Sequence, residues 1–422
     1  MKHGLRMVAV LAVLGLVAAA CAQDEDGGGG GGDTGPAAGL GAVTVAAGEP
    51  IRIATLQSNT GDTASLGIDQ ERAVEIAIAD RGGELLGHPI ELQKEDDGCD
   101  AAVGTTAAQK IVADPQIVGI VGTSCSGAAV PASEIMSEAG LTMISGSNTS
   151  AILTAVGPTE GPAHQDGYFR TAHNDGLQSE AAATFVFNDL GLQNVAYLHD
   201  GDPYTQGLAD GFGAFFEEQG GTVTLATAVN KGDTDMRPVL TEVVESGAEL
   251  LYFPIFQPEG DFIVKQCTEV EGCSDLTLMG ADGLLSDTFV SIKDTEGMYF
   301  SGPSIPETAA YSDFVAKYEE AYGEKPIQSF HAQAYDATNI LLDAIEGAAT
   351  EQDDGSLVID RQAIRDAVQA TSGIDGVASS YTCNEFGDCS FPKIDVVQNT
   401  TDQQELTDVR ANVLYTFDPA AA

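Results

Sequence analysis

Positive charge is scarce in this chain of 422 residues. There are 18 Lys and Arg against 64 Asp and Glu, and the formal net charge is −46 at pH 7. A surface of that sign repels phosphates and offers no basic patch to hold them, so nucleic acid is excluded as a partner. Such acidity is also typical of proteins that work in high salt, where screening shortens the reach of self-repulsion. Ordinary solubility is the alternative interpretation, and both stay open.

Catalytic signatures are missing as well. The six histidines are scattered, and the chain has neither a G-x-S-x-G elbow nor a Gly-rich nucleotide-binding loop. The cysteines lack the C-x2-4-C spacing of structural zinc sites. The sequence therefore predicts a protein that is not an enzyme, with no cofactor and no metal.

The N-terminus has the features of an export signal. Lys2 and Arg6 precede the short apolar run 7–20, and Cys21 follows that run directly. The run is shorter than the ~20 apolar residues that span a bilayer, and no later stretch is long and apolar enough to do so. We interpret 1–20 as a signal peptide and Cys21 as the site of lipid attachment, although Ala18 stands where bacterial lipoproteins usually carry Leu.

Residues 21–49 are predicted to form a flexible tether, because the unbroken glycine run 27–32 cannot pack. The body of the protein would then be exported and anchored by the lipid on Cys21 to the outer face of the cell membrane. An uncleaved membrane anchor is the alternative.

Six cysteines remain after Cys21, and an even number in an exported protein favours disulfides. Two pairs are close in sequence and form small loops, which leaves the third pair, although fifteen pairings are formally possible. The predicted pairs are Cys267 with Cys273, Cys383 with Cys389, and Cys99 with Cys125.

From residue 51 onward, short β-rich runs alternate with helical patterns, and the alternation restarts near residue 180. This pattern predicts an α/β fold with two lobes, each built on a parallel sheet that helices cover on both faces. An irregular, β-leaning tail closes the chain. The predicted strands are 51–57, 90–95, 117–121, 141–144, 195–198, 223–228, 250–254 and 277–279. The predicted helices are 63–80, 101–113, 130–138, 180–190, 206–219, 236–246, 260–267, 309–322, 330–347 and 361–371.

Ligands of such sheets bind beyond the carboxyl ends of the strands. Loops 122–127 and 145–150 follow two strands of the first lobe and are rich in small residues and hydroxyls, including Ser126, Ser147 and Thr149. Free N–H groups and a helix dipole at such places can hold an anion such as a carboxylate. Simple helix capping is the structural alternative.

Three residues after strands of the second lobe are candidates for the other side of the site. Tyr204 and Phe256 are aromatics in polar loops, which either cover a ligand or pack between loops. Asp282 lies between glycine-rich neighbours at a strand end, where a carboxylate suits an ammonium group or simply forms a turn.

Taken in order, these segments resemble the leucine/isoleucine/valine-binding protein family, the type I substrate-binding proteins of ABC transporters. The likeness covers roughly residues 50–417. It is carried by the opening IRIATLQSNTGDTASLG, the Asp96-Asp97 strand end, Cys99 with Cys125, the SCS and ISGSNTS loops, HDGDPYTQGLADGF and MGADG.

The resemblance implies a two-lobe fold of the type I periplasmic binding proteins, with three crossover segments near 170–172, 301–304 and 384–389. The first lobe would comprise 50–170 plus 303–384, and the second 171–302 plus 385–417.

The resemblance also assigns roles in the cleft. Ser126 would bind the ligand α-carboxylate beside Thr149, and the backbone carbonyl of Ser147 would accept from the α-ammonium. Tyr204 would close over the ligand from the second lobe. Asp282 would pair with the ammonium, where the best-known members have Glu.

Two positions depart from the family and leave the ligand side chain open. Phe256 stands near a family tyrosine, and Leu66 stands where many members carry an aromatic. The expected function is capture of an amino acid, branched-chain or otherwise apolar, by lobe closure, and delivery to an ABC transporter permease. A binding protein for amides, urea or short organic acids, or a sensory lipoprotein, is the alternative.

Overall fold

The computed structural model describes residues 39–400 and 405–420. The predicted signal peptide 1–20, Cys21 and the tether up to residue 38 lie outside the described residues. All elements below belong to one unit, Gly39–Ala422. Within the described ranges, no helix combines the length and the apolar character needed to cross a membrane.

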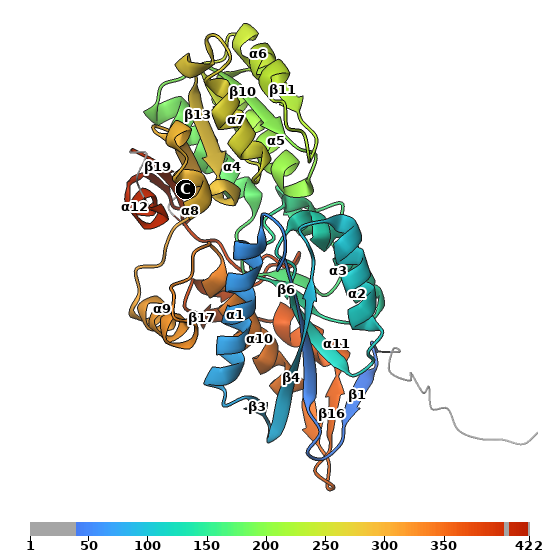
Figure 1. The fold of residues 1–422 in the computed structure, drawn as a ribbon. Helices are drawn as coiled ribbons and strands as arrows, with labels where there is room; N and C mark the ends of the chain where they lie inside the picture. The colour runs from blue at the N-terminus through green and yellow to red at the C-terminus, as the bar shows by residue number, and fades with distance from the viewer. Residues whose placement is uncertain (1–38, 401–404, 421–422) are drawn as a thin grey trace, which may run out of the picture. The chain divides into compact units, whose positions relative to one another are not determined.

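A six-stranded sheet forms the centre of the first lobe (Figure 1). In spatial order its strands are β3 (Glu84–Leu85), β4 (His88–Asp96), β2 (Ile51–Gln57), β5 (Ile117–Gly122), β6 (Met143–Ser145) and β9 (Tyr168–Arg170). From β4 to β9 all neighbours are parallel, and only β3 is antiparallel. Successive residues of β2 enter different clusters, Ile53 on one face and Ala54 on the other. Burial on both faces explains the almost continuous apolar sequence of this strand.

Helices cover both faces of this sheet. One face carries α1 (Ala64–Asp80), α10 (His331–Ala348) and α11 (Arg361–Gln369), and α9 (Ala309–Tyr322) packs on α1. The other carries α2 (Ala101–Val112) and α3 (Ser126–Glu138). Helix α3 begins four residues before the predicted 130–138. It continues through Pro131. Proline lacks an N–H group, so a single helical hydrogen bond is lost, the one to the carbonyl of Gly127.

A strand also forms inside the range predicted as tether, 21–49. β1 (Ala42–Val45) pairs antiparallel with β16 (Leu357–Asp360), which pairs with β15 (Ala349–Glu351). The physical reason is an alternating pattern in which Val43 and Val45 are buried in the core of the first lobe. The structured body therefore starts earlier than residue 50.

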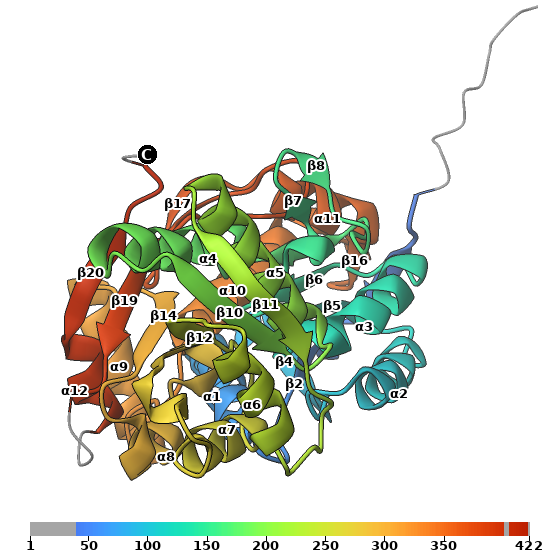
Figure 2. The same cartoon turned by 90° about the horizontal axis from the view of Figure 1, so that it is seen from above.

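The second lobe contains a seven-stranded sheet, seen from above in Figure 2. In spatial order its strands are β11 (Thr222–Ala228), β10 (Asn194–His199), β12 (Leu250–Tyr252), β13 (Thr277–Ala281), β14 (Tyr299–Pro303), β19 (Ile394–Gln398) and β20 (Val413–Phe417). The first five are parallel, and β19 and β20 add antiparallel strands at one edge. The β-leaning tail of the prediction thus completes this sheet.

The helices of the second lobe also lie on two faces. The cluster on one face includes α4 (Asp175–Thr184) and α5 (Pro203–Glu218). The opposite cluster includes α6 (Arg237–Glu245), α7 (Glu259–Cys267), α8 (Asp287–Val290) and α12 (Leu406–Ala411). Helix α4 starts at Asp175 rather than at residue 180, because the Asn174 side chain caps it by accepting from the Gly176 N–H. It ends in a π-helical turn, Phe185–Asp189.

The chain passes between the two sheets three times: after β9, after β14, and between β18 (Ser380–Thr382) and β19. The third passage carries a disulfide between Cys383 and Cys389, and Asp388 forms a parallel bridge with Arg170 of the first passage. All three predicted disulfide pairs are present, since Cys99 is bonded to Cys125 and Cys267 to Cys273. The remaining two-stranded ribbons are β7 (Ala155–Val156) with β8 (Thr159–Glu160), and β17 (Ser372–Asp375) with β18.

Candidate functional site

A single cleft between the two lobes is lined by all seven residues that the sequence analysis singled out. Four come from the first lobe and three from the second: Leu66, Ser126, Ser147, Thr149, Tyr204, Phe256 and Asp282. Six of these residues were found by the strand-end argument, and Leu66 was named only through the family resemblance.

The first lobe contributes the N-terminus of α3 to the cleft. Ser126 is its first residue, and its Oγ accepts from the Ser150 N–H at 3.2 Å. The first N–H groups of a helix have no intrahelical acceptor, and the helix dipole makes this end positive. Thr149, in the neighbouring loop, adds a buried hydroxyl-bearing side chain. This end of the cleft is suited to an anion.

The hydroxyl of Ser147 is used by the protein itself. It donates to the Ser124 carbonyl over 2.7 Å, and the Ser124 N–H in turn donates to Asp97 at 2.7 Å. Burial raises the pKa of Asp97 to about 7. No described residue donates to the Ser147 backbone carbonyl, so this oxygen is the acceptor that Ser147 can offer to a ligand.

The second lobe contributes a buried carboxylate. Asp282 opens the 3-10 turn Asp282–Leu284 after β13, and its Oδ1 accepts from Gln178 Nε2 at 2.7 Å and from the Tyr204 hydroxyl at 3.1 Å. Burial raises the pKa of Asp282 to about 6. None of the described lysines and arginines forms an ion pair with it. A ligand cation beside Asp282 would therefore stabilise its ionised form.

Apolar groups form the remaining wall. The rings of Tyr204 and Phe256 lie 5.2 Å apart between centroids, and Leu66 is in the first turn of α1. Phe330, not singled out by the sequence, stacks on His173 at 5.9 Å and has a φ of 77°. A large side chain in this left-handed conformation costs on the order of 1–3 kcal/mol, and such residues concentrate at functional sites.

The support of Asp282 was missed by the sequence analysis. His173 Nε2 donates to Gln178 Oε1 at 2.5 Å, which directs the Gln178 amide N–H towards Asp282. Burial lowers the pKa of His173 to about 4, so the ring is neutral near pH 7. Asp175 is also buried here, and burial together with the charge of Asp282 raises its pKa well above the usual value. The capping residue Asn174 was the available signal that α4 begins early enough to include Asp175 and Gln178.

Further polar side chains line the cleft and were also missed. They are Asp62, Thr63, Ser65, Gln257, Ser286, Gln328 and Ser329, whereas Ser124, which also lines the cleft, lies in the predicted loop 122–127. Gln328 and Ser329 come from the segment before α10, whose return to the cleft depends on the path of the chain between the lobes.

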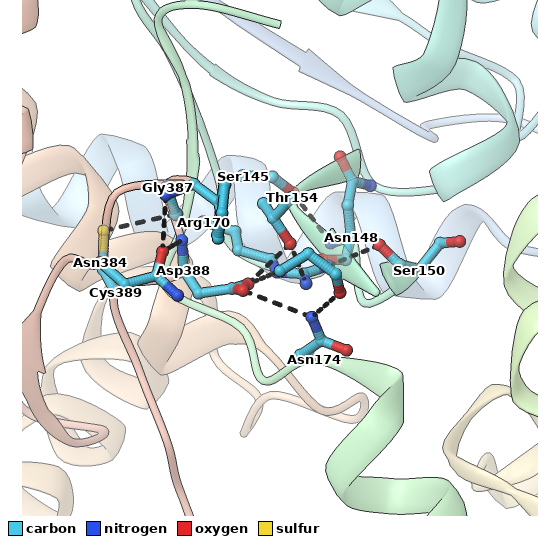
Figure 3. Close-up of polar contacts among 12 residues, drawn as sticks. Ser145, Asn148, Ser150, Thr154, Arg170, Asn174, Asn384, Gly387, Asp388 and Cys389 are labelled. Atoms are coloured by element: carbon cyan, nitrogen blue, oxygen red, sulfur yellow. Dashed lines mark hydrogen bonds and ion pairs between the residues drawn. The ribbon is translucent and has the colours of Figure 1, made fainter. Parts of the chain in front are cut away.

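A buried arginine, Arg170, makes hydrogen bonds to the backbone of loop 145–150 (Figure 3). Arg170 Nη1 donates to the carbonyls of Asn148 at 3.2 Å and Ser150 at 2.8 Å, and its Nη2 donates to Thr154. The same side chain pairs with Asp388 of the third passage. The backbone that presents Ser147 and Thr149 is thereby connected to the segments that join the lobes.

Comparison with known proteins gives a consistent result. Residues 50–387 match a protein family described as periplasmic binding protein. A Leu/Ile/Val-binding protein homolog of Brucella melitensis is 29% identical over 353 residues, which cover 82% of this chain and 90% of the relative.

Solved structures show the same fold. A leucine binding protein LivK from Thermotoga maritima superposes with a TM-score of 0.74 at 22% identity, covering 88% of this chain and 100% of the other. A branched-chain amino acid transporter substrate binding protein LivJ from Streptococcus pneumoniae, in complex with isoleucine, gives a TM-score of 0.70 at 21% identity. It covers 87% of this chain and 99% of the other.

Proposed function

The chain belongs to the periplasmic binding protein family, and we propose that it binds a free amino acid between its two lobes. The observation that carries this proposal is the polarity of the cleft. One lobe offers a helix N-terminus with hydroxyl groups, and the other offers Asp282, a buried acid without an ion-pair partner among the described residues. An α-amino acid carries a carboxylate and an ammonium group and complements both.

In this proposal the ligand carboxylate binds to Ser126, Thr149 and the N–H groups at the start of α3. The ammonium group lies between the Ser147 carbonyl and Asp282. Tyr204 covers the ligand from the second lobe, and movement about the three passages opens and closes the cleft.

The ligand side chain is proposed to be branched-chain or otherwise apolar. Leu66, Phe256 and Phe330 supply apolar surface in the same cleft. The relative from Brucella melitensis is named for leucine, isoleucine and valine. Phe256 has no hydroxyl to contact a ligand, which favours a side chain without hydrogen-bonding groups.

The proposal includes a place in the cell. The loaded protein would deliver its ligand to an ABC transporter permease while a lipid on Cys21 anchors it to the outer face of the membrane. The basic and apolar start of the chain supports export. Substitution Cys21→Ser should abolish incorporation of labelled palmitate, and unchanged labelling would refute the anchor.

Calorimetric titration with three matched compounds tests the ligand. Leucine carries both charged groups, 4-methylpentanoate lacks the ammonium, and 3-methylbutylamine lacks the carboxylate. We expect leucine to bind and both analogues to lose about 2 kcal/mol or more, since each leaves one end of the cleft unpaired. Equal binding of 4-methylpentanoate would instead identify a receptor for organic acids.

A further inference from the structure

A small cavity adjoins the ligand cleft and shares two wall residues with it, Ser329 and Phe330. Its volume is about 20 Å³, little more than the ~10–15 Å³ that one water molecule needs. In a chain with 64 Asp and Glu, no described acidic residue lines this cavity. The groups that do line it are hydrogen-bond donors from three different elements, and we call the space the donor cavity.

The first turn of α10 forms one wall of the donor cavity. This helix has 18 residues, and no side chain caps its N-terminus, because the cap position is held by Phe330, which has no oxygen to accept a hydrogen bond. His331, Ala332 and Gln333 line the cavity, and no described carbonyl accepts from their backbone N–H groups. These N–H groups and the helix dipole make this end of α10 positive.

Arg410 of α12 adds a full positive charge to the wall. Its Nη2 donates to Ser329 Oγ at 2.7 Å, and within the described ranges its other N–H groups have no acceptor. Burial lowers the pKa of this guanidinium, and three carboxylates attract it without hydrogen bonding to it, those of Asp69, Asp282 and Asp287. A partly buried cation of this kind is stabilised by an anion that accepts its free N–H groups.

The hydroxyl of Ser304 is the third donor. Ser304 follows β14 and lines the donor cavity, and its Oγ is buried without a partner among the described residues. Buried hydroxyl groups almost always have a hydrogen-bond partner. The Tyr311 hydroxyl differs, because it bonds to His331 Nε2 at 3.0 Å, while His331 Nδ1 bonds to the Gln328 carbonyl at 2.7 Å. The Ser304 hydroxyl is therefore free to donate into the cavity.

We propose that the donor cavity binds a small monoatomic anion, with chloride as its occupant. The ion accepts from the first turn of α10, from the Arg410 guanidinium and from the Ser304 hydroxyl. No described carboxylate in the wall repels it, and the volume is too small for a polyatomic anion such as sulfate. This inference goes beyond the proposed function and does not depend on it.

Chloride NMR line widths on the full-length protein test the site, because exchange with a protein site broadens the chloride signal. The wild type should broaden the signal, and Arg410→Gln should lose most of that broadening. Arg410 and Ser329 belong to different lobes, so the measurement is made without and with leucine, and a loss in either condition supports the site. Equal broadening by the two proteins in both conditions would overturn the proposal.

Ser304→Ala removes a single oxygen from the wall and decides the matter if Arg410→Gln does not fold. It should weaken chloride binding about tenfold, as expected for the loss of one hydrogen bond to a charged group. Chloride binding at wild-type affinity in Ser304→Ala would contradict the donor cavity as the location. Arg237→Gln is the matched control, since Arg237 is an exposed arginine of the same lobe, and this variant should keep the broadening.

Competition separates a site of this size from general attraction to positive charge. Bromide should displace chloride, whereas sulfate at the same ionic strength should not, and equal displacement by sulfate would contradict a small-anion site. In crystals grown with bromide, the anomalous signal should lie between Arg410 and the first turn of α10. Bromide found only at other positions would overturn the proposal. If leucine fails to bind, the proposed function fails, but the measurements without leucine still test the anion site.

Discussion

Arg170 Nε donates to Asp388 Oδ1 over 2.6 Å, and both side chains are buried. The pair joins the first and third passages between the lobes, and Asn174 Nδ2 adds a contact to Asp388 Oδ2 at 3.3 Å. Arg170 thus contacts both loop 145–150 and Asp388, and Asp388 in turn connects the third passage to Asn174, the cap residue of α4 (Figure 3).

Replacing only one partner of the Arg170–Asp388 ion pair should strongly destabilise the protein. Asp388→Asn or Arg170→Met leaves a buried charge without its partner and should lower the free energy of unfolding by about 3–5 kcal/mol. Urea unfolding followed by circular dichroism measures the change. Arg237→Met is the control, since the pair of Arg237 with Asp235 is exposed to solvent and its loss should change the free energy of unfolding little. Similar losses in the two variants would contradict the importance assigned to the buried pair.

Asp282→Asn should weaken leucine binding while preserving the cleft. Asparagine keeps an oxygen for the Gln178 and Tyr204 donors but removes the charge proposed to pair with the ligand ammonium. Loss of this pairing should reduce affinity by about 2–5 kcal/mol, which is about thirtyfold or more. Calorimetry measures the change, and Asp275→Asn, at an exposed position of the same lobe, is the control. Unaltered leucine affinity in Asp282→Asn would contradict the proposed pairing of Asp282 with the ligand ammonium.

The stability of the ligand-free protein should fall as pH rises from 5 to 7 through Asp282. Burial raises the pKa of this carboxyl to about 6, above its usual 3.8, so in this window the native state binds a proton that the unfolded state has released. The stability associated with that proton is complete below pH ~4 and is lost as pH passes through the folded pKa. Thermal melts of Asp282→Asn should therefore decline less between pH 5 and 7 than those of the wild type. Parallel curves would show that Asp282 does not titrate there.

Most strands and helices of the two parallel sheets could be predicted because their signals are local, but the parallel strands β9 and β14 were not. Apolar runs such as 51–57 and helical spacing such as 309–322 agree with β2 and α9 to the residue. The strands β1, β19 and β20 could not be predicted from such local signals. β1 is stabilised by β16 near the other end of the chain, and β19 and β20 gain their order from β14. Such pairing depends on the path of the whole chain.

The candidate site, too, could be predicted only where the signal was local in the sequence. Residues directly after strands, such as Ser126 and Asp282, were found because parallel strands end at one edge of a sheet. The resemblance of the chain to a family is confirmed by the match over residues 50–387, and the roles of the single residues stay predictions. Gln178, His173 and Phe330 were missed because none of them follows a predicted strand. His173 follows β9, which was not predicted, Gln178 lies inside α4, and Phe330 lies between α9 and α10.

Gln178→Leu should change the pH dependence of leucine binding. The Gln178 hydrogen bond lowers the pKa of Asp282 against the larger effect of burial, so its removal should raise that pKa above about 6. A hydrogen bond to a charged group contributes about 1.5–3 kcal/mol, and affinity at pH 6 should therefore fall about tenfold or more. At pH 8.5, where Asp282 is ionised in both proteins, most of the difference should disappear. Calorimetry at the two pH values checks this, with Gln193→Ala at an exposed position as the control. An equal loss of leucine affinity at both pH values would mean that Gln178 contributes only packing. A loss confined to low pH would show that its hydrogen bond stabilises the ionised form of Asp282.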